Sequence, residues 1–167
     1  AAMDNFDIVV LTQDWHPARH KSFASSYENK KPFETIEMFY GSQVLWPDHC
    51  IQGSMGAKFH LNLNHEKANV IIRKGSNPTV DSYSAFFEND KVTPTGLHGY
   101  LQDRDVTDLT LVGLATDFCV AFSAVDAAKL GYSVTVRLDM ARAIDNGGSL
   151  NSAINKMSKA GVNLENG

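Results

Sequence analysis

The sequence is poor in cysteine, in long apolar runs and in excess positive charge. It contains two cysteines, Cys50 and Cys119, among 167 residues, which is too few for a disulfide scaffold and is typical of a reducing compartment. No apolar run approaches the roughly 20 residues that a membrane-spanning helix needs. The formal net charge of -4 gives no basic surface for nucleic acid. We therefore expect neither a membrane nor a nucleic acid among the partners.

A secretory signal is also missing from the sequence. The first residues, AAMDNFDIVVLTQDWHP, contain neither a basic start nor an apolar segment that ends in a cleavage site. The predicted location is therefore the cytoplasm. A hydrophobic content of 43% and a charged content of 20% are ordinary for a soluble globular protein. The length suits a single domain over residues 1–167.

Short apolar runs alternate along the chain with patterns of helical spacing. Residues 13–57, which are rich in aromatic side chains and contain several prolines, predict loops with at most short helices. Strands followed by helices imply right-handed crossovers and a parallel sheet, which is an α/β fold. The predicted strands are residues 6–12, 68–73, 109–114 and 133–138; the predicted helices are residues 94–103, a stretch from 116 or 117 to just before 131, and residues 149–160.

One strand-turn-helix segment, LTLVGLATDFCVAFSAVDAAKLG, places a thiol where it could react. Thr116 or Asp117 is the predicted N-cap, so Cys119 falls in the first turn of the helix. Helix N-termini favour the thiolate, which is the nucleophilic form of cysteine. A buried structural cysteine is equally compatible with this stretch, because free cysteine is among the most buried residue types.

Other polar side chains follow the ends of two further predicted strands. Asp14 and His16 come after the first strand, and Lys74 ends the second. Since the carboxyl ends of parallel strands meet at one edge of a sheet, where ligands bind, we expect these groups to converge with Cys119. Lys74 near Cys119 would favour the thiolate and could shuttle a proton. The alternative is a surface lysine whose stem lies on apolar residues.

Carboxylate and imidazole groups also form a possible metal site. Asp14, His16 and His20 read Asp-x-His-x3-His, and His49 follows in Trp-Pro-Asp-His-Cys. Such ligands suit zinc, manganese or iron, although loop histidines more often form local hydrogen bonds or face solvent. The aromatic residues could wall a pocket for a flat ring, or be plain core: Trp46, Tyr83, Phe86, Phe87 and Phe118.

Four segments in order resemble the nicotinamidases of the isochorismatase-like cysteine hydrolase superfamily. They are TQDWHPARHKSFA, LWPDHCIQGSMGA, IIRKG followed by DSYSAF, and GLATDFCVAFSAVDAAKLGY. The resemblance implies a three-layer α/β sandwich with a six-stranded parallel sheet flanked by helices. It also implies an amidase that converts nicotinamide to nicotinate and ammonia, with pyrazinamide as an alternative substrate.

The resemblance assigns roles to the matching positions. Cys119 matches the nucleophile and Lys74 the family's lysine, while a cis peptide precedes the position of Ala115, whose amide would form the oxyanion hole with that of Cys119. The resemblance implies one divalent ion, with zinc favoured over iron or manganese, that holds the pyridine nitrogen. Its ligands match Asp14, His16 and His49, with His20 held less firmly because only some members use it; Trp46, Tyr83 and Phe118 match positions around the ring.

The sequence departs from the family at its first strand. That strand normally ends with an aspartate that accepts the thiol proton, and nothing here matches it: Asp4 and Asp7 precede the first predicted strand. We expect the missing central strand and its aspartate to be absent from the sequence given, to lie in a separate piece of a nicked protein, or to come from a partner chain. A non-catalytic ligand-binding remnant and an amidase for another small amide remain alternatives. The oligomeric state, including a homo-oligomer, is left open.

Overall fold

The computed structural model describes residues 2–167 as two compact units. The first unit ends at Asp81, and the second runs from Ser82 to Gly167. Each unit contains parallel strands of its own. No helix among the described residues combines the length and the apolar character that crossing a membrane requires.

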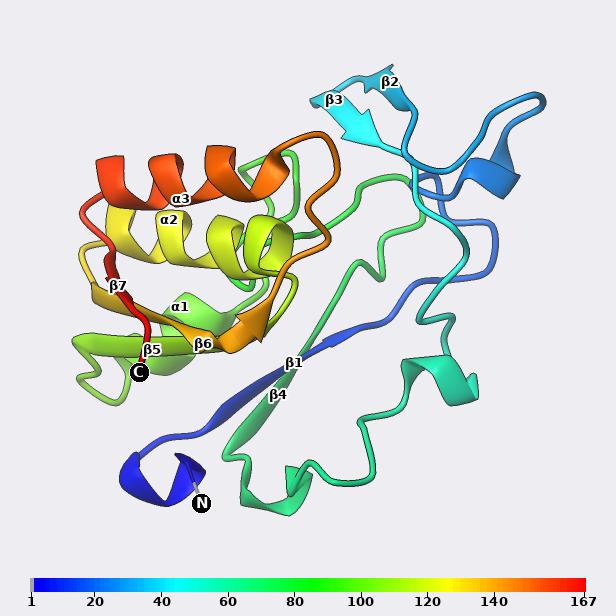
Figure 1. The fold of residues 1–167 in the computed structure, drawn as a ribbon. Helices are drawn as coiled ribbons and strands as arrows, with labels where there is room; N and C mark the ends of the chain where they lie inside the picture. The colour runs from blue at the N-terminus through cyan, green and yellow to red at the C-terminus, as the bar shows by residue number, and fades with distance from the viewer. Residues whose placement is uncertain (1) are drawn as a thin grey trace. The chain divides into compact units, whose positions relative to one another are not determined.

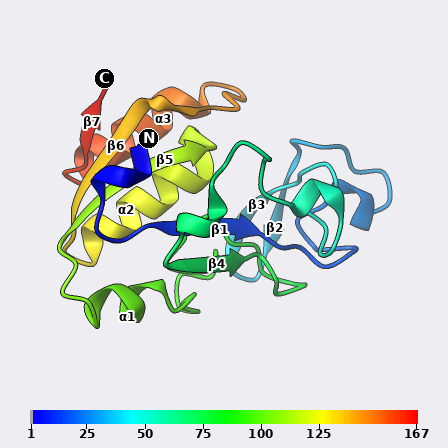
Figure 2. The same ribbon diagram turned by 90° about the horizontal axis from the view of Figure 1, so that it is seen from below.

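The first unit contains a pair of parallel strands that lie side by side in Figures 1 and 2. These are β1 (Val10–Asp14) and β4 (Val70–Lys74). Both were predicted, but each begins later than the apolar run that signalled it; Phe6, for example, is 49% exposed. The register pairs Asp14 with Lys74, so the two strands end by placing these residues next to each other.

The first unit also contains a hairpin where loops were predicted. Strands β2 (Thr35–Met38) and β3 (Gly41–Val44) are antiparallel, and Gly41 adopts a positive φ of 111° at their turn. Side chains alternate between exposed and half-buried along β2, which is the expected period for a strand. The remaining elements are single 3₁₀ turns: η1 (Ala2–Asn5), η2 (Ala24–Ser26), η3 (Met55–Ala57) and η4 (His65–Lys67).

The second unit is a three-stranded parallel sheet with helices packed on it. Its strands are β5 (Asp108–Leu114), β6 (Ser133–Arg142) and β7 (Asn163–Glu165), in that order. Helices α2 (Ala121–Lys129) and α3 (Ser149–Lys159) lie side by side over β6 and β7 (Figure 1). Ala124 and Ala127 on α2, Val136 on β6 and Met157 on α3 are fully buried. They form the core of this unit.

The α/β class is confirmed, and the differences lie in detail. The described parallel strands form two sheets, β1–β4 and β5–β6–β7; the resemblance implied a six-stranded sheet whose first, central strand is missing from this chain. Helix α1 (Leu97–Gln102) begins three residues after Pro94, because Gly96 has a left-handed φ of 95° that an α-helix cannot include. The short strand β7 was not predicted.

Candidate active site and metal centre

Three of the predicted metal ligands lie together in the first unit. Asp14, His16 and His49 each offer one ligand atom, and these atoms lie within 4.8 Å of one another. Asp14 comes from the end of β1, His16 follows two residues later, and His49 comes from the loop after β3. His16 is buried, whereas Asp14 and His49 are half-buried.

Backbone carbonyls orient both imidazoles of this cluster. The Nδ1 of His16 lies 2.9 Å from the Gly75 carbonyl oxygen, and the Nδ1 of His49 lies 2.8 Å from that of Pro47. A carbonyl can only accept, so each Nδ1 carries the proton and each Nε2 keeps its lone pair. This arrangement is usual for metal-ligating histidines. One carboxylate and two imidazoles therefore fit a divalent metal ion.

His20 is held differently, although the sequence placed it in the same motif. Its Nε2 donates to the Asn77 carbonyl at 2.7 Å, and its Nδ1 accepts from the Ser22 hydroxyl at 2.7 Å. Both ring nitrogens are therefore occupied. His20 is fully buried and lies with His16 and Asp81 in a second group of potential ligands, apart from Asp14 and His49.

The charges at this site favour the forms that bind metal. Burial raises the pKa of Asp14, but the adjacent Lys74 ammonium and its hydrogen bond, helped by His16 and His49, outweigh it and lower the pKa overall. Burial lowers the pKa of His16, against the opposing effect of the Asp81 and Asp14 carboxylates. The cluster thus presents an ionised carboxylate and a neutral imidazole, as coordination requires.

Lys74 is a buried residue and not a surface lysine. It is 4% exposed, and its ammonium forms an ion pair with Asp14. The alternative of a solvated side chain lying on apolar residues is therefore wrong. Burial is one of the conditions under which lysines take part in proton transfer.

In the second unit, Cys119 lies on an irregular turn between β5 and α2. The peptide bond between Leu114 and Ala115 is cis, as the resemblance implied. Residues Thr116–Val120 form the π-helical turn η5, and Cys119 in it is half-buried. Such π turns inside helices are frequent at functional sites.

The predicted N-cap of this helix is wrong. Ala115 occupies the capping position, and no side chain caps the helix. Asp117 instead accepts hydrogen bonds from the backbone N–H groups of Ile144 and Asp145 and from the Ser149 hydroxyl. Burial raises the pKa of Asp117, but these hydrogen bonds lower it by more. The carboxylate thus ties the Cys119 turn to the start of α3.

The predicted ring-binding residues divide between the units. Tyr83 and Phe118 are in contact in the second unit, with ring centroids 5.6 Å apart. Trp46 is buried in the first unit, edge-on to Phe33 at 6.0 Å. Lys74 and the metal ligands belong to the first unit, whereas Ala115 and Cys119 belong to the second. The convergence of the thiol with Lys74 stays a prediction.

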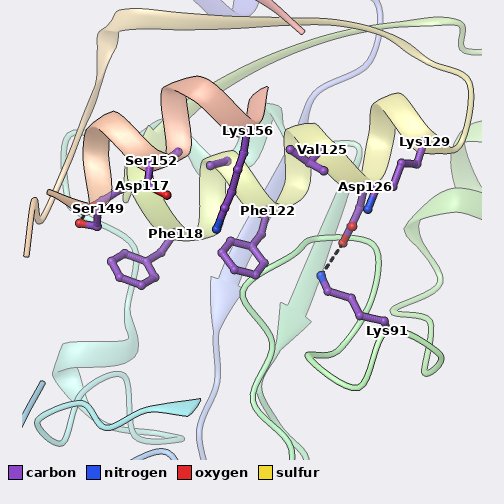
Figure 3. Close-up of a pocket in the computed structure, with 12 residues that line it drawn as sticks. Lys91, Asp117, Phe118, Phe122, Val125, Asp126, Lys129, Ser149, Ser152 and Lys156 are labelled. Atoms are coloured by element: carbon purple, nitrogen blue, oxygen red, sulfur yellow. Dashed lines mark hydrogen bonds and ion pairs between the residues drawn. The ribbon is translucent and has the colours of Figure 1, made fainter. Parts of the chain in front are cut away.

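Phe118 also lines a groove of about 290 Å³ between α2 and α3. Figure 3 shows its ring and that of Phe122 on one side, with the Lys156 side chain extending between them. An ion pair at 3.1 Å between Lys91 and Asp126 closes the other end. The sequence pattern did not single out this groove, because its lining residues are spread over two helices and a loop.

Comparison with known proteins identifies the family. The isochorismatase domain matches residues 6–165, nearly the whole chain. The chain belongs to the isochorismatase family. The match spans both compact units, so the candidate metal ligands and the Cys119 turn both lie within the matched region.

Several curated and solved relatives of this isochorismatase-family protein are nicotinamidases or pyrazinamidases. The nicotinamidase of Acinetobacter baylyi is 52% identical over 94% of this chain and 73% of its own length. The solved nicotinamidase pyrazinamidase of Acinetobacter baumanii is 52% identical, with a TM-score of 0.96 over 98% of this chain and 79% of its own. The pyrazinamidase of Pyrococcus horikoshii, solved in complex with zinc, is 30% identical, with a TM-score of 0.72 over 94% of this chain and 74% of its own.

Proposed function

We propose that this isochorismatase-family protein is a nicotinamidase, which hydrolyses nicotinamide to nicotinate and ammonia and also accepts pyrazinamide. The observation that carries the proposal is the 52% identity to a nicotinamidase over 94% of the chain. The thiol of Cys119 and the group formed by Asp14, His16 and His49 are both suited to amide hydrolysis.

Cys119 is the proposed nucleophile. The thiol gives its proton to a carboxylate base, and the thiolate attacks the carboxamide carbon. The resulting tetrahedral intermediate expels ammonia as the C–N bond breaks and the nitrogen takes that proton from the base. The product is a thioester on Cys119. Water then gives one proton to the base and attacks the thioester carbon. The C–S bond breaks, the base returns its proton to the sulfur to restore the thiol, and nicotinic acid leaves and ionises to nicotinate.

The backbone amides of Ala115 and Cys119 are the proposed oxyanion hole. Negative charge develops on the attacked carbonyl oxygen, and donors that are already in place stabilise it without reorganisation. One such donor is typically worth about 2.7–4 kcal/mol of the barrier. The cis peptide at Ala115 and the π turn after it set the course of the backbone on which both amides lie.

Asp14, His16 and His49 are the proposed ligands of one divalent ion, with zinc favoured. When bound, the ion supplies an anchor for the pyridine nitrogen of the substrate, which orients the ring for attack. Trp46, Tyr83 and Phe118 are the proposed walls for the ring. The neutral Nε2 atoms of the two histidines support this assignment, because their Nδ1 protons are committed to backbone carbonyls.

We also propose that a carboxylate other than Asp117 accepts the thiol proton of Cys119. Asp117, two residues from the nucleophile, already accepts three hydrogen bonds. Lys74 is paired with Asp14 and is the proposed partner in proton transfer.

Ammonia release from nicotinamide tests the function directly. We expect release from the protein loaded with zinc, and its loss in Cys119→Ala. The chain offers a matched control, because Cys50→Ala removes its other thiol and should leave the rate unchanged. Absence of ammonia release from a complete, metal-loaded sample would reject the proposal. A panel of small amides would then separate a different substrate from a non-catalytic binding protein.

A further inference from the structure

We infer that Gly75 is a positioning residue for His16: its carbonyl selects the imidazole nitrogen left for the metal, and its lack of a side chain leaves room for the ring. The inference rests on the proposed function in one respect, the assignment of His16 as a metal ligand. It adds a residue that contributes no ligand atom of its own.

The space around His16 is tight on the side of Gly75. A Cβ placed on Gly75 would lie 2.3 Å from Cε1 and 2.6 Å from Nδ1 of the His16 ring. Such distances are far inside van der Waals contact, so either the ring or the backbone must move. The ring is buried and packed among other rings, with centroids 4.7 Å away in His20, 4.9 Å in His49 and 5.4 Å in Phe23. It therefore has little room to retreat.

The backbone conformation alone does not set Gly75 apart. Gly75 has a φ of +66°, which favours glycine, but other glycines of the chain share this property. Gly53, at +77°, has no atom within 4 Å of the position that a Cβ would take. Among the described glycines, only Gly75 would bring a Cβ within 3 Å of another atom. The steric demand is thus specific to the contact with His16.

The loop that contains Gly75 also orients two imidazoles by hydrogen bonding. The Gly75 carbonyl takes the Nδ1 proton of His16 and leaves Nε2 free, whereas the Asn77 carbonyl takes the Nε2 proton of His20. Two carbonyls that are two residues apart therefore hold the two neighbouring imidazoles in opposite tautomers. The loop after β4 thus leaves the Nε2 of His16 available to a metal ion and holds the Nε2 of His20 in a hydrogen bond.

The experiment compares Gly75→Ala with Gly53→Ala. Zn²⁺ is titrated by calorimetry into the full, metal-free chain without substrate, and Co²⁺ absorption spectra report the ligand geometry. We expect Gly75→Ala to weaken Zn²⁺ binding by about 10–100-fold, as loss of a partner of a ligating histidine does, and to change the Co²⁺ spectrum. Gly53→Ala carries the same backbone strain without the contact and should match the parent protein in both.

A double mutant covers the case in which Gly75→Ala does not fold. His16→Ala removes the ring that the new methyl group would meet, so Gly75→Ala in that background should be no more destabilising than Gly53→Ala. Equal destabilisation by Gly75→Ala in the presence and absence of the His16 ring would overturn the inference. So would parent-like Zn²⁺ affinity in Gly75→Ala, or no Zn²⁺ binding by the parent chain. A parent chain that binds Zn²⁺ through His16 and releases no ammonia would reject only the proposed function.

Discussion

Asp117 illustrates how a single buried side chain can connect distant parts of the second unit. It is 4% exposed, and its carboxylate accepts the N–H groups of Ile144 and Asp145 at 3.0 and 2.8 Å, together with the Ser149 hydroxyl. It stands two residues before Cys119, the proposed nucleophile. Its ionised form therefore holds the loop before α3 against the turn that carries Cys119.

Asp117→Asn should destabilise the protein and remove part of its pH dependence. Hydrogen bonds to a charged group contribute about 1.5–3 kcal/mol each, and the amide would keep only part of them. Because the folded-state pKa of Asp117 is lowered, its stabilisation is fully present above the unfolded pKa of about 3.9. It is lost as the pH falls through the folded pKa. Urea unfolding at neutral pH and at progressively lower pH measures both effects.

The control for this prediction is Asp105→Asn, at an exposed position. It should leave the unfolding free energy and its acid dependence as in the parent protein. A parent-like stability and acid profile in Asp117→Asn would contradict the role given to this carboxylate.

The histidines show what a sequence can and cannot predict about such residues. The Asp-x-His-x3-His spacing and His49 pointed to ligands, and Asp14, His16 and His49 do gather within 4.8 Å. The separate position of His20 depends on the Ser22 and Asn77 groups that occupy its nitrogens. The Asn77 contact comes from a loop 57 residues away, which no local spacing could indicate.

At the scale of elements, Ser123 fixes the turn of Cys119 to a neighbouring loop. Its hydroxyl donates to the Cys119 carbonyl oxygen at 2.6 Å and accepts the Ala85 N–H at 2.9 Å. Ser123 is buried on α2, and Ala85 follows Tyr83, which packs on Phe118. The Ser123 hydroxyl thus joins the turn that contains Cys119 to the segment that contains Tyr83, a proposed wall of the ring pocket.

Ser123→Ala should lower both stability and activity. The buried Ala85 N–H and one acceptor site on Cys119 would lose their partner, at a cost of about 1–3 kcal/mol. Because the Cys119 backbone would be less firmly held, we expect the rate at saturating nicotinamide to fall more than the apparent affinity changes. Ser152→Ala on α3, at an exposed position, is the control and should stay within about 0.5 kcal/mol of the parent. Steady-state kinetics and thermal unfolding measure the two effects. Equal activity and stability of Ser123→Ala and Ser152→Ala would contradict the prediction.

Element types were easier to predict than their ends. Apolar runs correctly indicated β1, β4, β5 and β6, and the helical spacing before Gly161 indicated α3. The hairpin of β2 and β3 was missed because its strands are four residues each and bury few side chains fully. The N-cap was wrong because Asp117 finds its partners near residue 145, far along the chain. Tertiary hydrogen bonds overrode the local capping preference.

At the scale of the whole molecule, the proposed chemistry draws on both compact units. Asp14, His16, His49 and Lys74 belong to the first, and Ala115, Cys119, Tyr83 and Phe118 to the second. Metal binding and nucleophilic attack should therefore be separable by mutation. Variants at the proposed ligands in the first unit should change metal binding, and variants at Cys119 should leave it intact.

Zinc should stabilise the parent chain against unfolding, since a ligand that binds only the folded state adds about 2.7 kcal/mol at a free concentration of 100 times its dissociation constant. His49→Ala removes one of the three proposed ligands and should abolish most of this gain, whereas Cys119→Ala should keep it while losing ammonia release. His60→Ala, at an exposed position outside the cluster, should keep both. Thermal unfolding with zinc and with a chelator measures the difference. If His49 is a ligand, only His49→Ala should lose the zinc effect. A zinc effect of equal size in His49→Ala and His60→Ala would therefore show that the ion binds elsewhere.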